Sequence, residues 1–215
     1  MPRLKAFWLA GMVFAVLSAA PACSRAPAPA QPVPAPIAQV SGAQSVGAHP
    51  YSQRIWYRGQ DVPEIVFPGG VRRPIRSLLD VHHTMTFGDY VWDENGVPPG
   101  PLWIRVDIDA QLISVFRGDH EIGTAVILYG GNGKPTPVGA FHVQRKAKDY
   151  VSHTYDAPMP FALMLTSDGV AIHASNVRQG WATHGCIGVP NDFAKRLFDT
   201  AKLGDSVLII SATKT

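Results

Sequence analysis

Short apolar segments separated by turn residues recur through the second half of this chain of 215 residues. Apolar and polar residues alternate over 102–108 (LWIRVDI), and 112–116 (LISVF) follows directly after Asp109-Ala110 and Gln111. A period of two is typical of β-strands, and so short a connection is typical of a hairpin. Four further segments of this kind are predicted as strands: residues 122–129, 139–145, 161–165 and 169–173.

One amphipathic helix is predicted near the C-terminal end. Asn191 is the expected N-cap, and Gly204 is expected to end the helix. The apolar face consists of Phe193, Leu197, Phe198 and Ala201. Residues 206–210 (SVLII) then return as a strand. The expected fold class is therefore mainly β: a β-sandwich of short antiparallel and mixed strands with one or two packed helices.

The first 22 residues have the composition of an export signal. Arg3 and Lys5 give a basic start, and residues 7–17 (FWLAGMVFAVL) form an apolar run that is too short for a permanent membrane span. Two processing routes are open: cleavage after Ala22, or lipidation of Cys23 as the first residue of a bacterial lipoprotein. Either route predicts an exported protein, in the periplasm or as an outer-membrane lipoprotein of the cell envelope anchored through Cys23.

The rest of the chain divides into three predicted regions. Residues 23–50 are predicted to be a linker, because the alternation of Ala and Pro over 24–38 favours an extended spacer. Residues 51–100 carry aromatic residues between Pro and Gly breaks and are expected to pack as an extension in front of the main domain. Residues 101–211 are predicted to form that domain, since the length allows one well-buried core with appendages.

Charge and cysteine content restrict the possible partners. The formal net charge is +3, and no run interleaves Lys or Arg with aromatic residues, so nucleic acid is not an expected partner. The chain has two cysteines, Cys23 and Cys186, and exported proteins usually pair theirs. A disulfide between them would tie a linker to a Gly-flanked loop and gain little stability. Two separate roles are therefore predicted.

Cys186 is the candidate nucleophile. It ends the segment Thr183-His184-Gly185-Cys186, and His173 closes the strand predicted over 169–173. A thiol reacts as the thiolate, and a neighbouring imidazole can take its proton and hold the ion pair near neutral pH. Gly185 lets a substrate carbonyl approach the backbone, whose N–H groups can then face a developing oxyanion.

Zinc binding is the alternative for the same residues. His173, His184 and Cys186 all have ligand chemistry, but a fourth protein ligand is not evident. The pair His82-His83 also suggests metal binding, although adjacent residues of a strand point to opposite faces. We therefore do not expect a metal ion.

Taken in order, these motifs resemble the catalytic domain of the L,D-transpeptidase family. Ile172-His173 matches the family's strand end, and Thr183-His184-Gly185-Cys186-Ile187 matches its nucleophile loop. Thr136-Pro137-Val138-Gly139 matches the Thr-Pro-x-Gly turn, and residues 157–161 (APMPF) look like the stretch that precedes the substrate cleft. The resemblance extends over residues 101–211, about half of the chain.

The resemblance implies a two-step acyl transfer on the peptide stems of peptidoglycan, without a cofactor. Cys186 would attack the carbonyl on the L-centre of meso-diaminopimelate in a donor tetrapeptide, and the terminal D-alanine would leave. An acceptor amine would resolve the thioester, which cross-links stems or attaches a protein. His173 corresponds to the family's proton acceptor and donor. The family also forms thioesters with carbapenems.

Supporting residues follow from the same resemblance. Thr183 and His184 occupy positions expected to shape the nucleophile loop, and Gly185 belongs to the expected oxyanion site. The main-chain carbonyl of Ala174 is expected to fix the tautomer of His173, with its side chain uninvolved.

The chain departs from the family at Gly188, where many members carry Arg or Asn. Arg178 is expected to supply the missing positive charge and to contact substrate, and an ordinary solvated arginine is the alternative. Ser175 and Asn176 are expected to contact substrate or to orient the imidazole, and a solvent-facing turn is the alternative for both.

Three functions are consistent with the sequence. The first is L,D-transpeptidation. The second resolves the same thioester with water, as an L,D-carboxypeptidase or a cross-link hydrolase. The third is an inactive wall-binding lipoprotein, against which the joint presence of Cys186, His173 and Gly185 argues.

Overall fold

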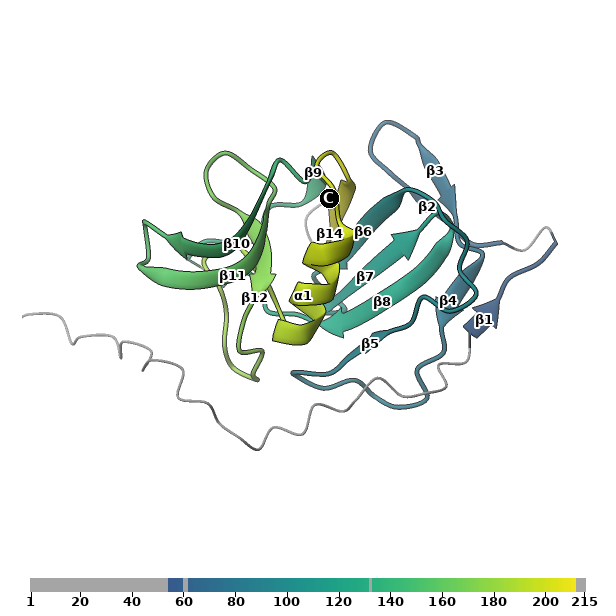
Figure 1. Ribbon diagram of the computed structural model, residues 1–215, viewed down its shortest axis with the longest axis horizontal. Helices are drawn as coiled ribbons and strands as arrows, with labels where there is room; N and C mark the ends of the chain where they lie inside the picture. Colours follow the sequence, from purple (N-terminus) through teal and green to yellow (C-terminus); the bar gives the residue numbers. More distant parts are fainter. Residues whose placement is uncertain (1–53, 60–61, 132, 212–215) are drawn as a thin grey trace, which may run out of the picture. The chain divides into compact units, whose positions relative to one another are not determined.

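The computed structural model describes residues 54–59, 62–131 and 133–211, so the predicted signal, linker and Cys23 lie outside the described residues. Within these ranges, two larger β-sheets and one helix share a core (Figure 1). The prediction of a mainly β fold with mixed strand directions is confirmed. No helix in the described ranges is long and apolar enough to cross a membrane.

The alternating segments form the centre of the larger sheet. The strands β6 (Leu102–Asp107), β7 (Leu112–Arg117) and β8 (His120–Val126) pair antiparallel in sequence order, as the hairpin spacing predicted. One face of these strands is buried in the core, through Ile104, Val106, Ile113, Val115, Ile122 and Ala125. The third strand ends at Val126 instead of Tyr129, because beyond it the backbone of Leu128 pairs with Gly188 of the smaller sheet.

Strands from both ends of the described chain complete this eight-stranded sheet, in the order β1-β4-β8-β7-β6-β14-β9 with β5 also on β8. The added strands are β1 (Arg54–Trp56), β4 (Ser77–Leu79), β5 (Tyr90–Trp92), β9 (Gly139–His142) and β14 (Ser206–Ile210). β14 runs parallel to β6 and antiparallel to β9. A separate hairpin is formed by β2 (Glu64–Val66) and β3 (Arg72–Pro74).

The smaller sheet has the order β10-β11-β12-β13. Its strands are β10 (Arg145–Ser152), β11 (Ala157–Met164), β12 (Ala171–Ala174) and β13 (Ile187–Val189). The first three are antiparallel, whereas β12 and β13 are parallel. The predicted strand 139–145 is in fact the junction of β9 and β10. There the chain changes sheets, because the Val143 N–H bonds to Asp205 while the Gln144 N–H bonds to Met164.

The helix α1 (Asn191–Thr200) packs against β11 and β12 (Figure 1). The prediction of Asn191 as N-cap is wrong by one residue: Pro190 occupies that position, and its carbonyl accepts the Ala194 N–H at 2.8 Å. The predicted end at Gly204 is also wrong, because Ala201 is already extended and Gly204 lies in the turn before β14. Phe193 is fully buried and meets the Trp92 ring edge-on, with centroids 5.4 Å apart.

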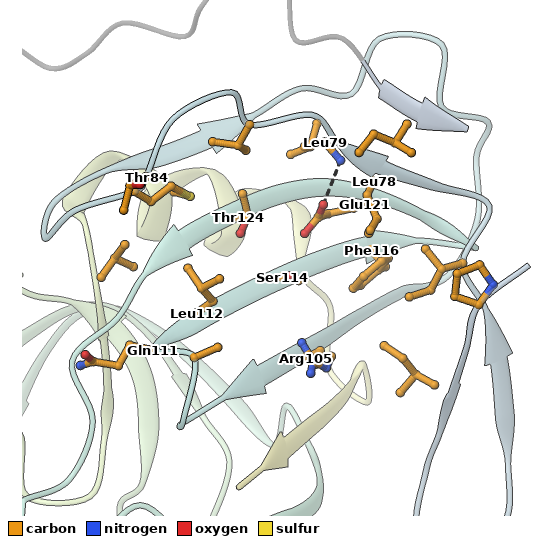
Figure 2. Close-up of a pocket in the computed structure, with 18 of the residues that line it drawn as sticks. Leu78, Leu79, Thr84, Arg105, Gln111, Leu112, Ser114, Phe116, Glu121 and Thr124 are labelled. Carbon is orange, nitrogen blue, oxygen red and sulfur yellow. Dashed lines mark hydrogen bonds between the residues drawn. The ribbon is translucent and has the colours of Figure 1, made fainter. Parts of the chain in front are cut away.

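The outer face of the larger sheet carries a hollow of about 720 Å³ (Figure 2), and neither Cys186 nor His173 is among the residues that line it. Arg105, Ser114, Thr124 and Glu121 are among its lining residues. The Glu121 carboxylate is buried and accepts the Leu79 N–H at 2.9 Å, which ties β4 to β8. Burial raises the pKa of Glu121, although hydrogen bonds from Ser114 and Leu79 act in the opposite direction. Glu121 therefore already has structural partners.

We expect Gly123→Ala to lower the free energy of unfolding by about 1–3 kcal/mol, the usual cost of overpacking a core. A Cβ at this position of β8 would lie 2.7 Å from Cζ3 of Trp92 and 3.2 Å from Cε2 of Phe193. Denaturant unfolding followed by tryptophan fluorescence measures the change. Gly133→Ala is the matched control, because no atom lies within 4 Å of its Cβ position. Equal stability of the two variants would contradict this account.

Candidate active site

The parallel pairing of β12 and β13 brings His173 and Cys186 to one face of the smaller sheet. Ile172 lies opposite Ile187, and both side chains are buried in the core. Because side chains alternate along a strand, His173 and Cys186 project to the other face. Cys186 packs there against a cluster that contains Ala171, on the same face of β12 as His173. The thiol and the imidazole are thus diagonal neighbours on adjacent strands.

His173 is held in one tautomer by the main chain. Its Nδ1 lies 2.8 Å from the carbonyl oxygen of Ala174, in a buried setting. A carbonyl only accepts hydrogen bonds, so Nδ1 carries the proton and Nε2 keeps its lone pair. Burial lowers the pKa of His173, and the bond to Ala174 works against this in part. The imidazole is therefore a neutral base.

The Cys186 thiol is also neutral in the free protein. Burial raises its pKa, while the Ala171 N–H and the charge of Lys134 lower it and Asp168 raises it further. Its Sγ lies 3.6 Å from the carbonyl oxygen of Gly169. The ion pair expected from the sequence is consequently disfavoured, because burial acts against both of its charged members.

The loop before Cys186 is held by Thr183. The Thr183 hydroxyl donates to the Cys186 carbonyl at 2.5 Å, and its N–H donates to Tyr129 at 2.9 Å. Gly185 has φ of 103°, a conformation that L side chains rarely adopt. Thr183 thus shapes the loop through its hydroxyl, and Gly185 permits the turn in front of the thiol.

The Thr-Pro-x-Gly turn packs against the same loop. Thr136 is buried, and its hydroxyl accepts the Gly130 N–H at 2.8 Å. Gly130 has no room for a side chain, since a Cβ would lie 2.6 Å from the nitrogen of Thr136. The Gly131 N–H in turn donates to the Thr183 carbonyl at 3.1 Å. This turn therefore supports the nucleophile loop from its outer side.

His184 points to a different environment from His173. It is exposed, and its ring stacks on Tyr155 at a centroid distance of 4.4 Å.

The residues that the structure describes contain no group of three or more His, Cys, Asp or Glu side chains that could hold a metal ion. His173, His184 and Cys186 accordingly do not converge on a zinc position. In the other histidine pair, Nε2 of exposed His82 lies 3.4 Å from the Asp80 carboxylate.

The three predicted substrate contacts lie in the loop between β12 and β13. Arg178 is exposed, and its Nε donates to the Asn176 side chain at 2.9 Å. Ser175 is half-buried, and its N–H donates to Val189 at 2.8 Å. Ser175 thus extends the β12–β13 pairing, while Arg178 and Asn176 form a surface turn.

The packing around position 188 explains why this chain has glycine there. Its N–H and carbonyl bond to Leu128, at 2.9 and 2.8 Å. A Cβ on Gly188 would lie 2.8 Å from the Ser175 Cβ and 3.4 Å from the Leu128 Cβ. The Ser175 side chain therefore occupies the space into which a larger residue at position 188 would project.

Three residues beside the nucleophile loop were missed by the sequence reasoning: Lys134, Tyr155 and Asp168. Lys134 directly precedes the Pro-Thr-Pro of the recognised turn, which was the available signal. Tyr155 and Asp168 stand in turns of unremarkable composition, and only the packing of β10, β11 and β12 brings these turns to the nucleophile loop.

The site thus combines a neutral thiol with an imidazole that is held in one tautomer, on one face of a mainly β fold. This is the arrangement of a cysteine–histidine site. The chain belongs to the L,D-transpeptidase catalytic domain family. The family profile described as YkuD, L,D-transpeptidase catalytic domain, matches residues 101–209. This stretch includes His173, Cys186 and the Thr136 turn.

The chain is similar to two L,D-transpeptidases over about half of its length. L,D-transpeptidase 1 of Mycobacterium tuberculosis is 30% identical over 133 residues, which cover 54% of this chain and 53% of that protein. Its crystal structure matches with 26% identity and a TM-score of 0.46, over 51% of this chain and 61% of that one. The C442S mutant of Enterococcus faecium L,D-transpeptidase matches with 25% identity and a TM-score of 0.48, over 52% and 50%. The chain spans about half the length of the curated relative it matches.

Alkylation of Cys186 by iodoacetamide should rise with pH to a midpoint above the ordinary range of a cysteine thiol. Burial raises its pKa, so the reactive thiolate is scarce at neutral pH. Mass spectrometry of a Cys23→Ala protein gives the rate at each pH, and an unstructured cysteine peptide is the reference. A midpoint below pH 7 would instead show a preformed ion pair.

Gly188→Ala should lower the free energy of unfolding by about 1–3 kcal/mol. The loss should be smaller in a Ser175→Gly background, because that change removes the Cβ only 2.8 Å away. Denaturant unfolding of the four proteins of this double-mutant cycle measures the coupling. Strictly additive effects would show that Ser175 is not what excludes a side chain at position 188.

Proposed function

We propose that the chain is a peptidoglycan L,D-transpeptidase in which Cys186 is the nucleophile and His173 the general base. The observation that carries this proposal is the projection of both residues from adjacent strands to one face, with the Ala174 carbonyl leaving Nε2 of His173 free to take a proton. Membership of the L,D-transpeptidase family supports the reaction class and peptide stems as the substrate.

In the first step, Sγ of Cys186 attacks the carbonyl carbon on the L-centre of diaminopimelate while its proton passes to Nε2 of His173. The N–H groups of Gly185 and Cys186 would stabilise the negative charge on the carbonyl oxygen. As the tetrahedral intermediate collapses, the imidazolium returns the proton to the nitrogen of D-alanine, which leaves. A thioester on Cys186 is the product of this step.

In the second step, the amine of an acceptor stem attacks the thioester carbonyl and loses a proton to His173. Collapse of this second intermediate releases the new amide and regenerates the thiol. Nε2 therefore receives and returns a proton in each half of the reaction, which is possible because Nδ1 stays bonded to Ala174 throughout. Ala174 and Thr183 act as positioning residues.

A neutral resting pair suits this sequence of steps. Because burial disfavours both the thiolate and the imidazolium, charge would develop only when a substrate carbonyl lies beside the thiol. The same burial would protect a free thiol from oxidation in an exported protein. Export, and membrane attachment through a lipidated Cys23, belong to this proposal as the sequence predicts them.

The test incubates the protein with a disaccharide that carries a tetrapeptide stem, and follows products by mass spectrometry. Wild type should release D-alanine and form a cross-linked dimer. Cys186→Ala should abolish both products, and His173→Gln should lower kcat/KM by roughly 10²–10⁴-fold because general acid–base catalysis is lost. Cys23→Ala, at the other cysteine, is the matched control and should retain activity.

Other outcomes separate the competing functions. Release of D-alanine without a dimer would identify a hydrolase that uses the same thioester. Products that do not depend on Cys186, or no products at all, would exclude both enzymes and favour a wall-binding protein. Imipenem offers a direct check of the nucleophile, since the LD transpeptidase LdtMt1 has been solved in complex with it. A covalent adduct on Cys186 is expected.

A further inference from the structure

The proposed function places an anionic peptide beside a site that lacks the family's expected cation. A donor stem that ends in D-alanine carries a terminal carboxylate, and diaminopimelate carries a second one. Gly188 has no room for a side chain, because its Cβ position is only 2.8 Å from the Ser175 Cβ. Any positive charge for these carboxylates must therefore come from another element.

Lys134 lies directly against the nucleophile loop. A Cβ built on Gly185 would be 3.7 Å from Cγ of Lys134 and 3.8 Å from Cε, so the lysine stem runs past the residue before Cys186. Its Nζ is 5.9 Å from the centre of the Tyr155 ring, which itself stacks on His184. The ammonium group is thus held between the nucleophile loop and an aromatic face.

The backbone holds Lys134 in this place. Its N–H donates to Gly131 at 3.1 Å, and the Gly131 N–H donates to Thr183 at 3.1 Å. The buried Thr136 hydroxyl closes the same turn onto Gly130. The turn that carries the lysine and the loop that carries the thiol are therefore bonded to each other, and their relative positions are preset before substrate arrives.

The Lys134 charge acts at the thiol, and it also lowers the pKa of Asp168, to a smaller extent than the hydrogen bond from Thr166 does. Among the described residues, the ion pairs within 4.0 Å do not include Lys134. The lysine lowers the pKa of Cys186, in opposition to burial and to Asp168. Arg178, the compensating cation expected from the sequence, instead bonds to Asn176 on an exposed turn.

We propose that Lys134 is the cation that binds a carboxylate next to Cys186, which under the proposed function is a carboxylate of the donor stem. Lys134 then determines specificity: it holds the anionic donor with the reacting carbonyl near Sγ. The positive charge therefore comes from the turn before Thr136. It does not come from position 188, where this chain has glycine.

The first experiment is independent of stem turnover. It compares the alkylation rates of Cys186 by anionic iodoacetate and neutral iodoacetamide, in a Cys23→Ala background. Lys134→Gln should lower the iodoacetate-to-iodoacetamide ratio several-fold, Lys134→Arg should keep it, and Lys148→Gln, at an exposed lysine of β10, should leave it unchanged. An unchanged ratio in Lys134→Gln would overturn the proposal. Equal thermal unfolding of the variants confirms that they fold.

The second experiment uses three tetrapeptide donors: unmodified, amidated at the terminal D-alanine, and amidated at the free carboxylate of diaminopimelate. Wild type should discriminate against one amidated donor by about tenfold in kcat/KM, and this identifies the carboxylate that is bound. Lys134→Gln should lose the discrimination while still turning over the amidated donor. Retained discrimination in Lys134→Gln, or its loss in Arg178→Gln alone, would overturn the assignment.

The two experiments separate the proposals. A lower alkylation ratio in Lys134→Gln without stem turnover by wild type would reject the transpeptidase function and support carboxylate binding beside the thiol. Stem turnover with an unchanged ratio and unchanged discrimination would support the function and reject the role of Lys134.

Discussion

The parallel pairing of β12 with β13 is the constraint on which the rest of the site depends. It is the only parallel pair within the described four-stranded sheet, and the burial of Ile172 and Ile187 sets its register. A slip of one residue in either strand would turn the isoleucine of that strand out of the core and would carry its thiol or imidazole into it. The hydrophobic core therefore enforces the geometry of a polar reaction centre.

Around this pair, each positioning hydrogen bond has a main-chain group on at least one side. The Ala174 carbonyl orients the imidazole, the Thr183 hydroxyl bonds to the Cys186 carbonyl, and the Gly130–Thr136 bond shapes the neighbouring turn. Substitution of Ala174 would leave its carbonyl in place, whereas the hydroxyls of Thr183 and Thr136 would be lost with their side chains. Gly130, Gly185 and Gly188 are restricted by space or by φ.

Local pattern was sufficient to predict the strands and the site motifs, but not their long-range partners. The alternation over 102–116 and the apolar face of α1 require no distant information, and both were predicted correctly. The split of 139–145 between two sheets depends on contacts with Asp205 and Met164, which no local pattern contains. Likewise Lys134 is 52 positions from Cys186 along the chain, and the expected thiolate–imidazolium pair ignored burial, which only the folded protein reveals.

The packing of Trp92 onto Gly123 has a consequence for where this domain begins. The match to the family starts at residue 101, yet β5 lies before it and places Trp92 between β8 and the helix residue Phe193. The helix in turn packs on β12, the strand of His173. The recognisable homology and the packed structure thus begin at different residues. A fragment that starts at residue 101 would lack Trp92, which packs against the helix that in turn packs on the strand of His173.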